Sequence, residues 1–213
     1  MIKTLAQLRS LYAEPGERAL RKQLDQLDRH GRRFIELAPF CVVASAGPQG
    51  RLLDASPRGG EPGFVKVMDP RCLLLPDSGG NNRLDTLENL LHDPRIALLF
   101  MVPGVDETLR VNGLAQLRDE AEITDLFSAE RQRPKLVIEV AVQEAYLHCA
   151  KAFMRSGLWR PESQVERKVL PTLNQIIHEQ IGLATAVESQ EDMVRRYEAQ
   201  LQTERQAGPT SSH

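Results

Sequence analysis

Hydrophobic and polar positions follow two different periods along the chain, and the change between them divides it. Residues 1 to 37 place leucines at spacings of three, four or seven, in LAQLRSLY and ERALRKQLDQLDRHGRRFIEL. Such spacing puts apolar side chains on one face of a helix. Pro15 and Gly16 separate two such helices, and Pro39 closes the second. The pattern predicts packing helices with one stripe able to dock on a core, formed by Leu20, Leu24, Leu27, Phe34 and Leu37.

From Phe40 to about Cys149 the pattern changes to extended segments separated by turns. FCVVASAG and RLLDASP are joined by PQG, GFVKVMD and CLLLPD by DPR, and PRIALLFMV and ETLRVNGLAQL by PGVD. KLVIEVAVQEAYLHC is a last long strand. Six or seven such strands with short turns favour a small closed or partly open barrel. The segments do not alternate regularly between strand and helix, as they would in a parallel sheet.

One short helix is predicted within this series of strands. NRLDTLENLLHD carries four leucines on one face and precedes Pro94, so the helix should run from about Arg83 to His92. The residues before it, DSGGNN, leave backbone N–H groups free at the helix start, where Arg83 adds a positive charge. We interpret this as an anion-binding element. The alternative for Asn82 alone is a plain N-cap.

A second element of this kind lies in RLLDASPRGG. Pro57 restricts Ser56 to extended backbone, and Gly59 and Gly60 end any regular structure directly after Arg58. We therefore expect Arg58 near a strand end, at the mouth of the sheet. Taken alone, it would be a solvated arginine. The basic helix start supplies a second anion-binding element, which favours a binding role for Arg58 over that of a solvated charge.

Three further segments follow Cys149. AKAFMRSGLWRPES is basic, VLPTLNQIIHEQIG has helical spacing, and EDMVRRYEAQLQTERQ reads as a charged helix. We therefore divide the chain into an N-terminal helical extension (1–38), a barrel (39–150), a C-terminal helical segment (151–206) and a disordered tail (207–213).

Composition and charge argue against several kinds of partner. The 27 Lys and Arg balance 29 Asp and Glu, for a net charge of −2, and no block of like charges indicates nucleic acid or anionic lipid. Three widely spaced cysteines suggest neither a disulfide framework nor a zinc site, so we predict no metal. No apolar run approaches the roughly 20 residues of a spanning helix, and the N-terminus lacks a signal-peptide core. We expect a cytoplasmic protein with no membrane partner.

Residues 72–113, CLLLPDSGGNNRLDTLENLLHDPRIALLFMVPGVDETLRVNG, resemble the core of the pyridoxamine 5′-phosphate oxidase-like, FMN-binding split-barrel family. The resemblance lies in the order of pieces: a strand ending at a loop, a basic residue opening a short helix, a DPR-type turn, an apolar strand and a return strand RVNG. Upstream, VVASAGPQGRLLDASPRG resembles the first hairpin of that family. The similarity covers about half of the chain.

The resemblance implies an α+β protein, mostly β with flanking helices, built on an antiparallel six-stranded Greek-key split barrel. It implies a homodimer with FMN at the subunit interface and a small-molecule substrate. Carried over to matching positions, Ser56 and Arg58 on the second strand and Asn82 and Arg83 at the helix start bind the cofactor phosphate. The remaining implied positions are Pro76 and Asp77 along the flavin edge, Thr108 facing the ring, and Lys66 as a looser candidate.

Two departures separate the chain from the oxidase proper. That enzyme has a second basic residue after the helix-start arginine, where this chain has Leu84. It also has an Arg-x-His substrate motif, whereas His148 stands in YLHCA without that arginine. Pyridoxamine phosphate is therefore not the expected substrate, and the chain resembles the FMN-dependent branch outside the oxidase.

We accordingly expect an FMN-dependent oxidoreductase in which the isoalloxazine ring carries the electrons, and no catalytic side chain is identified. The alternative is a protein that binds flavin, haem or a deazaflavin without turnover, for sensing, storage or stress protection. His148 with Cys149 supplies no chelate set and is better interpreted as a histidine at the barrel rim. Trp159 either packs the C-terminal segment, which we favour, or covers the flavin of a partner subunit.

Overall fold

The structure is a computed structural model that describes residues 1–48, 51–77, 79–80, 82–129, 133–183 and 188–206. Its centre is a seven-stranded sheet in the order β2-β1-β5-β6-β7-β4-β3, with every neighbouring pair antiparallel. The strands are β1 (Phe40–Ala46), β2 (Leu53–Gly59), β3 (Lys66–Asp69), β4 (Cys72–Pro76), β5 (Arg95–Met101), β6 (Thr108–Arg118) and β7 (Val137–His148).

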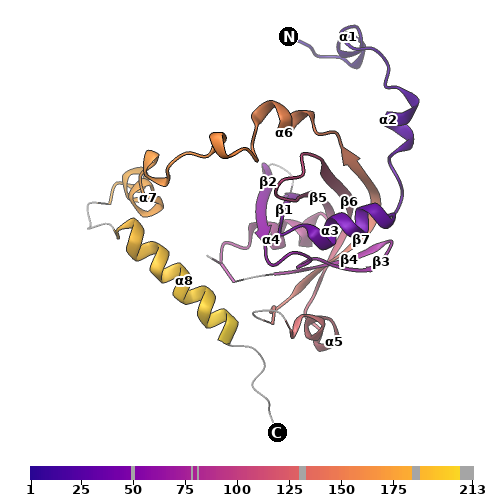
Figure 1. Cartoon of the computed structure of the whole chain (residues 1–213). Coiled ribbons are helices and arrows are strands. Elements are labelled where there is room, and N and C mark those ends of the chain that lie inside the picture. Colours follow the sequence, from indigo (N-terminus) through magenta and orange to yellow (C-terminus); the bar gives the residue numbers. More distant parts are fainter. Residues whose placement is uncertain (49–50, 78, 81, 130–132, 184–187, 207–213) are drawn as a thin grey trace.

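The sheet curls around one core without closing, and β2 and β3 form its two edges (Figure 1). This confirms the expected α+β split barrel, with seven strands in place of six. The expected tail, 207–213, lies outside the described residues.

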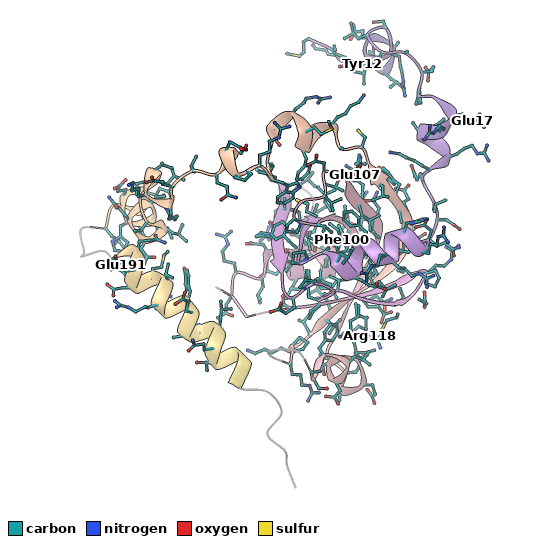
Figure 2. The ribbon with its side chains drawn as sticks, in the orientation of Figure 1. Tyr12, Glu17, Phe100, Glu107, Arg118 and Glu191 are labelled. Carbon is teal, nitrogen blue, oxygen red and sulfur yellow. The ribbon has the colours of Figure 1, made fainter. Side chains whose placement is uncertain are left out.

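One face of the sheet forms the core. Alternate residues of β1 and β5 are buried, as the period of two along a strand requires. Phe100 is completely buried and lies in the middle of the barrel (Figure 2). Its neighbours in the core include Cys41, Val43, Leu98, Val111 and Val140.

The opposite face of β1, β2 and β5 is apolar but only partly covered. Phe40 and Leu53 are 37% and 82% exposed, and Val42, Ala44 and Leu99 are half-buried. The register pairs these side chains across the three strands, so they form one continuous surface.

Three short helices precede the barrel: α1 (Leu5–Arg9), α2 (Glu17–Arg21) and α3 (Arg29–Leu37). The single helix predicted after Gly16 is wrong, because the chain leaves the helix at Lys22 and runs extended. Leu24 and Ala145 exchange backbone hydrogen bonds of 3.1 and 2.8 Å. Strand β4 pairs only with the first half of β7, up to Ala141. Leu24 therefore pairs with the edge of the second half of β7, which β4 leaves open.

The stripe predicted for this region docks only in part. Leu27 is buried and Phe34 packs against the core, whereas Leu20, Leu24 and Leu37 are 60%, 39% and 42% exposed. Helix α3 begins where the Asp28 carboxylate accepts a hydrogen bond of 2.7 Å from the Gly31 backbone N–H. The stripe therefore contributes side chains to the core only through Leu27 and Phe34, while Leu24 is held by its backbone.

After the barrel the chain continues along its outside to α7 and α8 (Figure 1). The Trp159 Nε1 donates a 3.0 Å hydrogen bond to the Val105 carbonyl, and its ring stacks on Phe153 at 5.4 Å between centroids. Trp159 thus packs the C-terminal segment onto the turn between β5 and β6, as favoured from the sequence. The remaining helices are α4 (Asp85–His92), α5 (Ala121–Thr124), α6 (Lys151–Ser156), α7 (Leu173–Ile181) and α8 (Gln190–Gln206).

No helix in the described part of the chain combines the length and the apolar character that crossing a membrane requires.

Candidate functional site

A cleft of about 950 Å³ opens where the ends of β2 and β4 meet the start of α4 and the segment before β7. Leu201 of α8 lines it as well, so stretches distant in sequence share one hollow. Six of the eight residues implied by the resemblance lie on its wall: Ser56, Arg58, Pro76, Asp77, Asn82 and Arg83.

Polar side chains of β2 alternate on the face that looks toward α4. The Ser56 hydroxyl donates a 2.8 Å hydrogen bond to the Asp54 carboxylate, which also accepts one of 2.9 Å from the Thr86 hydroxyl. Asn89 of α4 donates to the Ser45 hydroxyl of β1 at 3.0 Å. These bonds fasten α4 to the first hairpin. Because the Ser56 hydroxyl already donates to Asp54, it can donate to a ligand only after that hydrogen bond breaks.

Arg58 is half-buried, and it pairs with Cys41 at the start of β1. Its guanidinium donates a 3.0 Å hydrogen bond to the Pro57 carbonyl. Burial raises the pKa of the Asp77 carboxyl, and the nearby charge of Arg58 opposes that rise. Burial likewise raises the pKa of the Cys41 thiol to about 12, again against the charge of Arg58. The guanidinium therefore lies close enough to Asp77 on the cleft wall to act on its charge, although burial has the larger effect.

The start of α4 differs from the prediction. The helix begins at Asp85, and its N-cap residue is Leu84, with φ of 58° and no side-chain cap. Asn82 is also left-handed, at φ of 58°, so its plain N-cap interpretation is wrong. Left-handed backbone is uncommon for residues other than glycine. The chain therefore reaches α4 through two unusual turns, which place Arg83 between them.

Arg83 is engaged with its own helix. Its Nε donates a 2.7 Å hydrogen bond to the Asp85 carboxylate, and its side chain is 72% exposed. This contact lowers the pKa of the Asp85 carboxyl. The side chain lies on the cleft wall, but a ligand there competes with Asp85 for it.

The sequence interpretation missed the basic segment before β7. Arg133 and Lys135 both line the cleft. Arg133 forms an ion pair of 3.0 Å with Asp125 and donates a 2.8 Å hydrogen bond to the Thr124 hydroxyl. The signal was present in RQRPKLV, whose charges directly precede an apolar strand.

Two predicted residues lie elsewhere. The Lys66 ammonium sits over the Phe127 ring at 4.9 Å, next to the second, smaller core cluster. Thr108 is buried at the start of β6, opposite His148 in the register with β7. The structure thus does not bring Lys66 or Thr108 to this cleft. His148 ends β7, as expected for a rim residue, and the described residues contain no group of three metal-ligating side chains.

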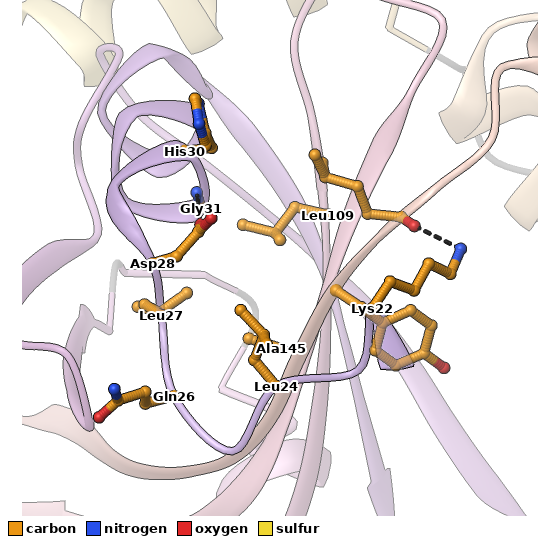
Figure 3. A pocket seen from close by; sticks show the side chains of 11 residues that line it. Lys22, Leu24, Gln26, Leu27, Asp28, His30, Gly31, Leu109 and Ala145 are labelled. Carbon is orange, nitrogen blue, oxygen red and sulfur yellow. Dashed lines mark hydrogen bonds between the residues drawn. The ribbon is translucent and has the colours of Figure 1, made fainter. Parts of the chain in front are cut away.

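A second cavity of about 310 Å³ lies between β6, β7 and the N-terminal segment (Figure 3). Its wall is mainly apolar, with Leu24, Leu27 and Leu109 among its residues. The Lys22 ammonium at its rim donates a 2.7 Å hydrogen bond to the Leu147 carbonyl. None of the residues implied by the resemblance lines this cavity.

The donor set of the larger cleft fits a phosphate-bearing flavin. Guanidinium groups and the N-terminal end of α4 suit a phosphate. Apolar side chains on the same wall suit an aromatic ring system, and they include Phe64, Pro76, Leu87 and Leu136.

The family model described as pyridoxamine 5′-phosphate oxidase matches residues 27–149. The chain belongs to this family. The matched residues span α3 and all seven strands of the barrel. They also contain every position that the resemblance assigned to the cofactor, and they exclude α6, α7 and α8.

Several solved structures are similar to this member of the pyridoxamine 5′-phosphate oxidase family. HupZ from Group A Streptococcus is 15% identical, with 57% of this chain and 93% of that chain covered and a TM-score of 0.46. A putative pyridoxamine 5′-phosphate oxidase from Lactobacillus delbrueckii is 18% identical, with 59% and 98% covered and a TM-score of 0.46. An F420 reductase is 13% identical, with 57% and 98% covered and a TM-score of 0.39. No curated protein matches the chain.

Proposed function

We propose that the protein is an FMN-dependent oxidoreductase acting on a small molecule. The observation that carries the proposal is the cleft, where Arg58, the start of α4 and a basic segment converge in a chain of the pyridoxamine 5′-phosphate oxidase family. Bound FMN supplies the redox chemistry through its isoalloxazine ring. The side chains of the protein bind and orient it.

The phosphate end of the site is formed by Arg58 and Arg83 with the first residues of α4. A flavin phosphate carries nearly two negative charges, for which guanidinium forks are suited partners. Arg58 holds its position through the Pro57 carbonyl, whereas Arg83 must leave Asp85 to contribute. We therefore assign Arg58 the larger share of phosphate binding.

The remaining assigned residues place the flavin edge. Pro76 ends β4 and Asp77 follows it, both on the wall of the cleft, and Asn82 lies between β4 and α4. Since burial raises the pKa of Asp77, this carboxyl holds a proton more readily than an exposed one. Asp77 is thus suited to change its proton occupancy as the charge beside it changes.

We further propose that the protein is a homodimer with the flavin at its interface. The outer face of β1, β2 and β5 exposes an apolar surface that includes Phe40, Leu53 and Leu99. A second copy that covers this face would remove it from water. Light scattering should then report twice the chain mass of 23.9 kDa.

A second candidate function is cofactor binding without turnover. The described wall of the cleft contains no histidine or cysteine, so proton transfer there would depend on carboxyl groups such as that of Asp77. The same wall offers no histidine, cysteine, methionine or tyrosine as an axial ligand for haem iron. The donor set therefore favours a flavin or deazaflavin over haem at this position.

The visible spectrum of freshly purified protein, followed by anaerobic addition of NADH or NADPH, tests the proposal. We expect a flavin spectrum that bleaches on reduction and recovers when an acceptor is admitted. A flavin spectrum that neither nucleotide changes would favour binding without turnover. A haem spectrum would contradict both assignments of this cleft.

A further inference from the structure

The cations of the cleft differ in how strongly the protein itself engages them. Arg83 is paired with Asp85, and Arg133 with Asp125 and the Thr124 hydroxyl. A charge already paired by the protein gains less from a ligand, because it must exchange one partner for another. The cation with the fewest competing contacts is therefore the most available to an anion.

Lys135 is that cation. Its side chain is exposed on the cleft wall, and among the described residues its ammonium has no hydrogen-bond or ion-pair partner. A lysine ammonium is a compact charge on a flexible stem and binds phosphate as a point charge. Lys135 can thus reach an anion in the cleft without breaking an existing contact.

The backbone holds Lys135 next to the loop that enters α4. The Asp77 N–H donates a 3.0 Å hydrogen bond to the Leu136 carbonyl, which continues the pairing of Pro76 with Val137 beyond β4. Pro134, on the other side of Lys135, is buried. Fixed neighbours on both sides hold the Cα of Lys135 at the wall, while its side chain stays free to move.

Helix α4 itself offers one cation where the resemblance to the oxidase implies two. Leu84 stands directly after Arg83, is 50% exposed, and contributes no charge. The phosphate end of the cleft would then rest on Arg58 and on an Arg83 that Asp85 holds. A cation from another element would supply the second positive charge that the oxidase has at this helix start.

We propose that Lys135 binds the cofactor phosphate and takes the role that Leu84 cannot fill. This inference rests on the proposed FMN site. It assigns phosphate selectivity to three elements: the end of β2 through Arg58, the start of α4 through Arg83, and the segment before β7 through Lys135.

The test compares dissociation constants for FMN and for riboflavin, which lacks the phosphate, by flavin fluorescence at low ionic strength. Lys135→Gln should weaken FMN binding about tenfold, the loss expected for one charge-assisted contact at an exposed site. Riboflavin affinity should stay unchanged, and Lys135→Arg should retain most of the FMN affinity. Lys151→Gln, an exposed lysine of α6 outside the cleft, is the matched control and should change neither.

The outcomes separate this inference from the function on which it rests. If the wild type prefers FMN over riboflavin and Lys135→Gln keeps the same preference, Lys135 does not bind the phosphate, while the FMN site stands. If riboflavin affinity falls as much as FMN affinity, Lys135 supports the fold or the ring, and the inference is wrong. A wild type without any preference for FMN would overturn the proposed function as well.

Discussion

Replacing Asp85 by asparagine should tighten FMN binding, although the substitution adds no contact. Asp85 accepts a 2.7 Å hydrogen bond from Arg83, and both side chains are substantially exposed, at 42% and 72%. Asparagine removes the charge that holds Arg83 and the repulsion between a carboxylate and the phosphate. The released guanidinium is then free to meet the phosphate.

The size of the effect follows from the exposure of the pair. An exposed ion pair shifts an equilibrium by at most about fivefold. We therefore expect Asp85→Asn to tighten FMN binding about twofold to fivefold, and Arg83→Ala to weaken it by about tenfold. In the double variant the gain from Asp85→Asn should disappear, because the two side chains act through one contact.

Fluorescence titrations with FMN and riboflavin at low ionic strength measure these effects. Asp93→Asn is the matched control, since Asp93 follows the other end of α4 and pairs with Arg95 outside the cleft. Added salt should reduce the gain from Asp85→Asn. The reasoning is refuted if Asp85→Asn weakens FMN binding, or if it tightens FMN and riboflavin equally.

Three further predictions concern other parts of the cleft and the core. Arg58→Ala should weaken FMN binding by about tenfold to a hundredfold and leave riboflavin nearly unchanged, by the same titration; equal losses would assign Arg58 to the ring or the fold. Asp77→Asn should raise the Tm near neutral pH, because the raised pKa of Asp77 means that stability falls as pH rises through that pKa. Thermal unfolding across pH should show that the Tm difference between Asp77→Asn and the wild type vanishes below the ordinary aspartate pKa of 3.8. A Tm difference that stays constant with pH would contradict this prediction. A thiol reagent should modify exposed Cys149 in the native protein but Cys41 only on unfolding, because burial raises the Cys41 pKa to about 12; early labelling of Cys41 by mass spectrometry would oppose this.

The strands and α4 could be predicted because their signals are local. Alternating burial in β1 and β5, and the burial of Leu87 and Leu90 on α4, follow directly from the period of each segment. The other two leucines expected on that face of α4 are exposed, Leu84 by 50% and Leu91 by 74%. The break after α2 could not, since it depends on Ala145, far along the chain, offering an open strand edge to Leu24. Helical spacing alone does not reveal such a competing partner.

The sequence predicted the cleft only where proline and glycine residues mark the end of a strand. Pro57 and the following glycines located Arg58 at a strand end, whereas nothing local placed Lys135 in the same cleft. That placement depends on the pairing of β4 with β7, which brings the residues beside Lys135 to the end of β4. The position of Lys66 could not be predicted either, because its ammonium lies over the ring of Phe127, a residue about sixty positions further along the chain.

Chromatography and mass spectrometry of the cofactor released from the purified protein test the central claim most directly. The account predicts FMN, at about one per chain after reconstitution, because the cleft combines cations for a terminal phosphate with an apolar wall for the ring. Recovery of FAD or haem, or of no cofactor after incubation with FMN, would contradict it.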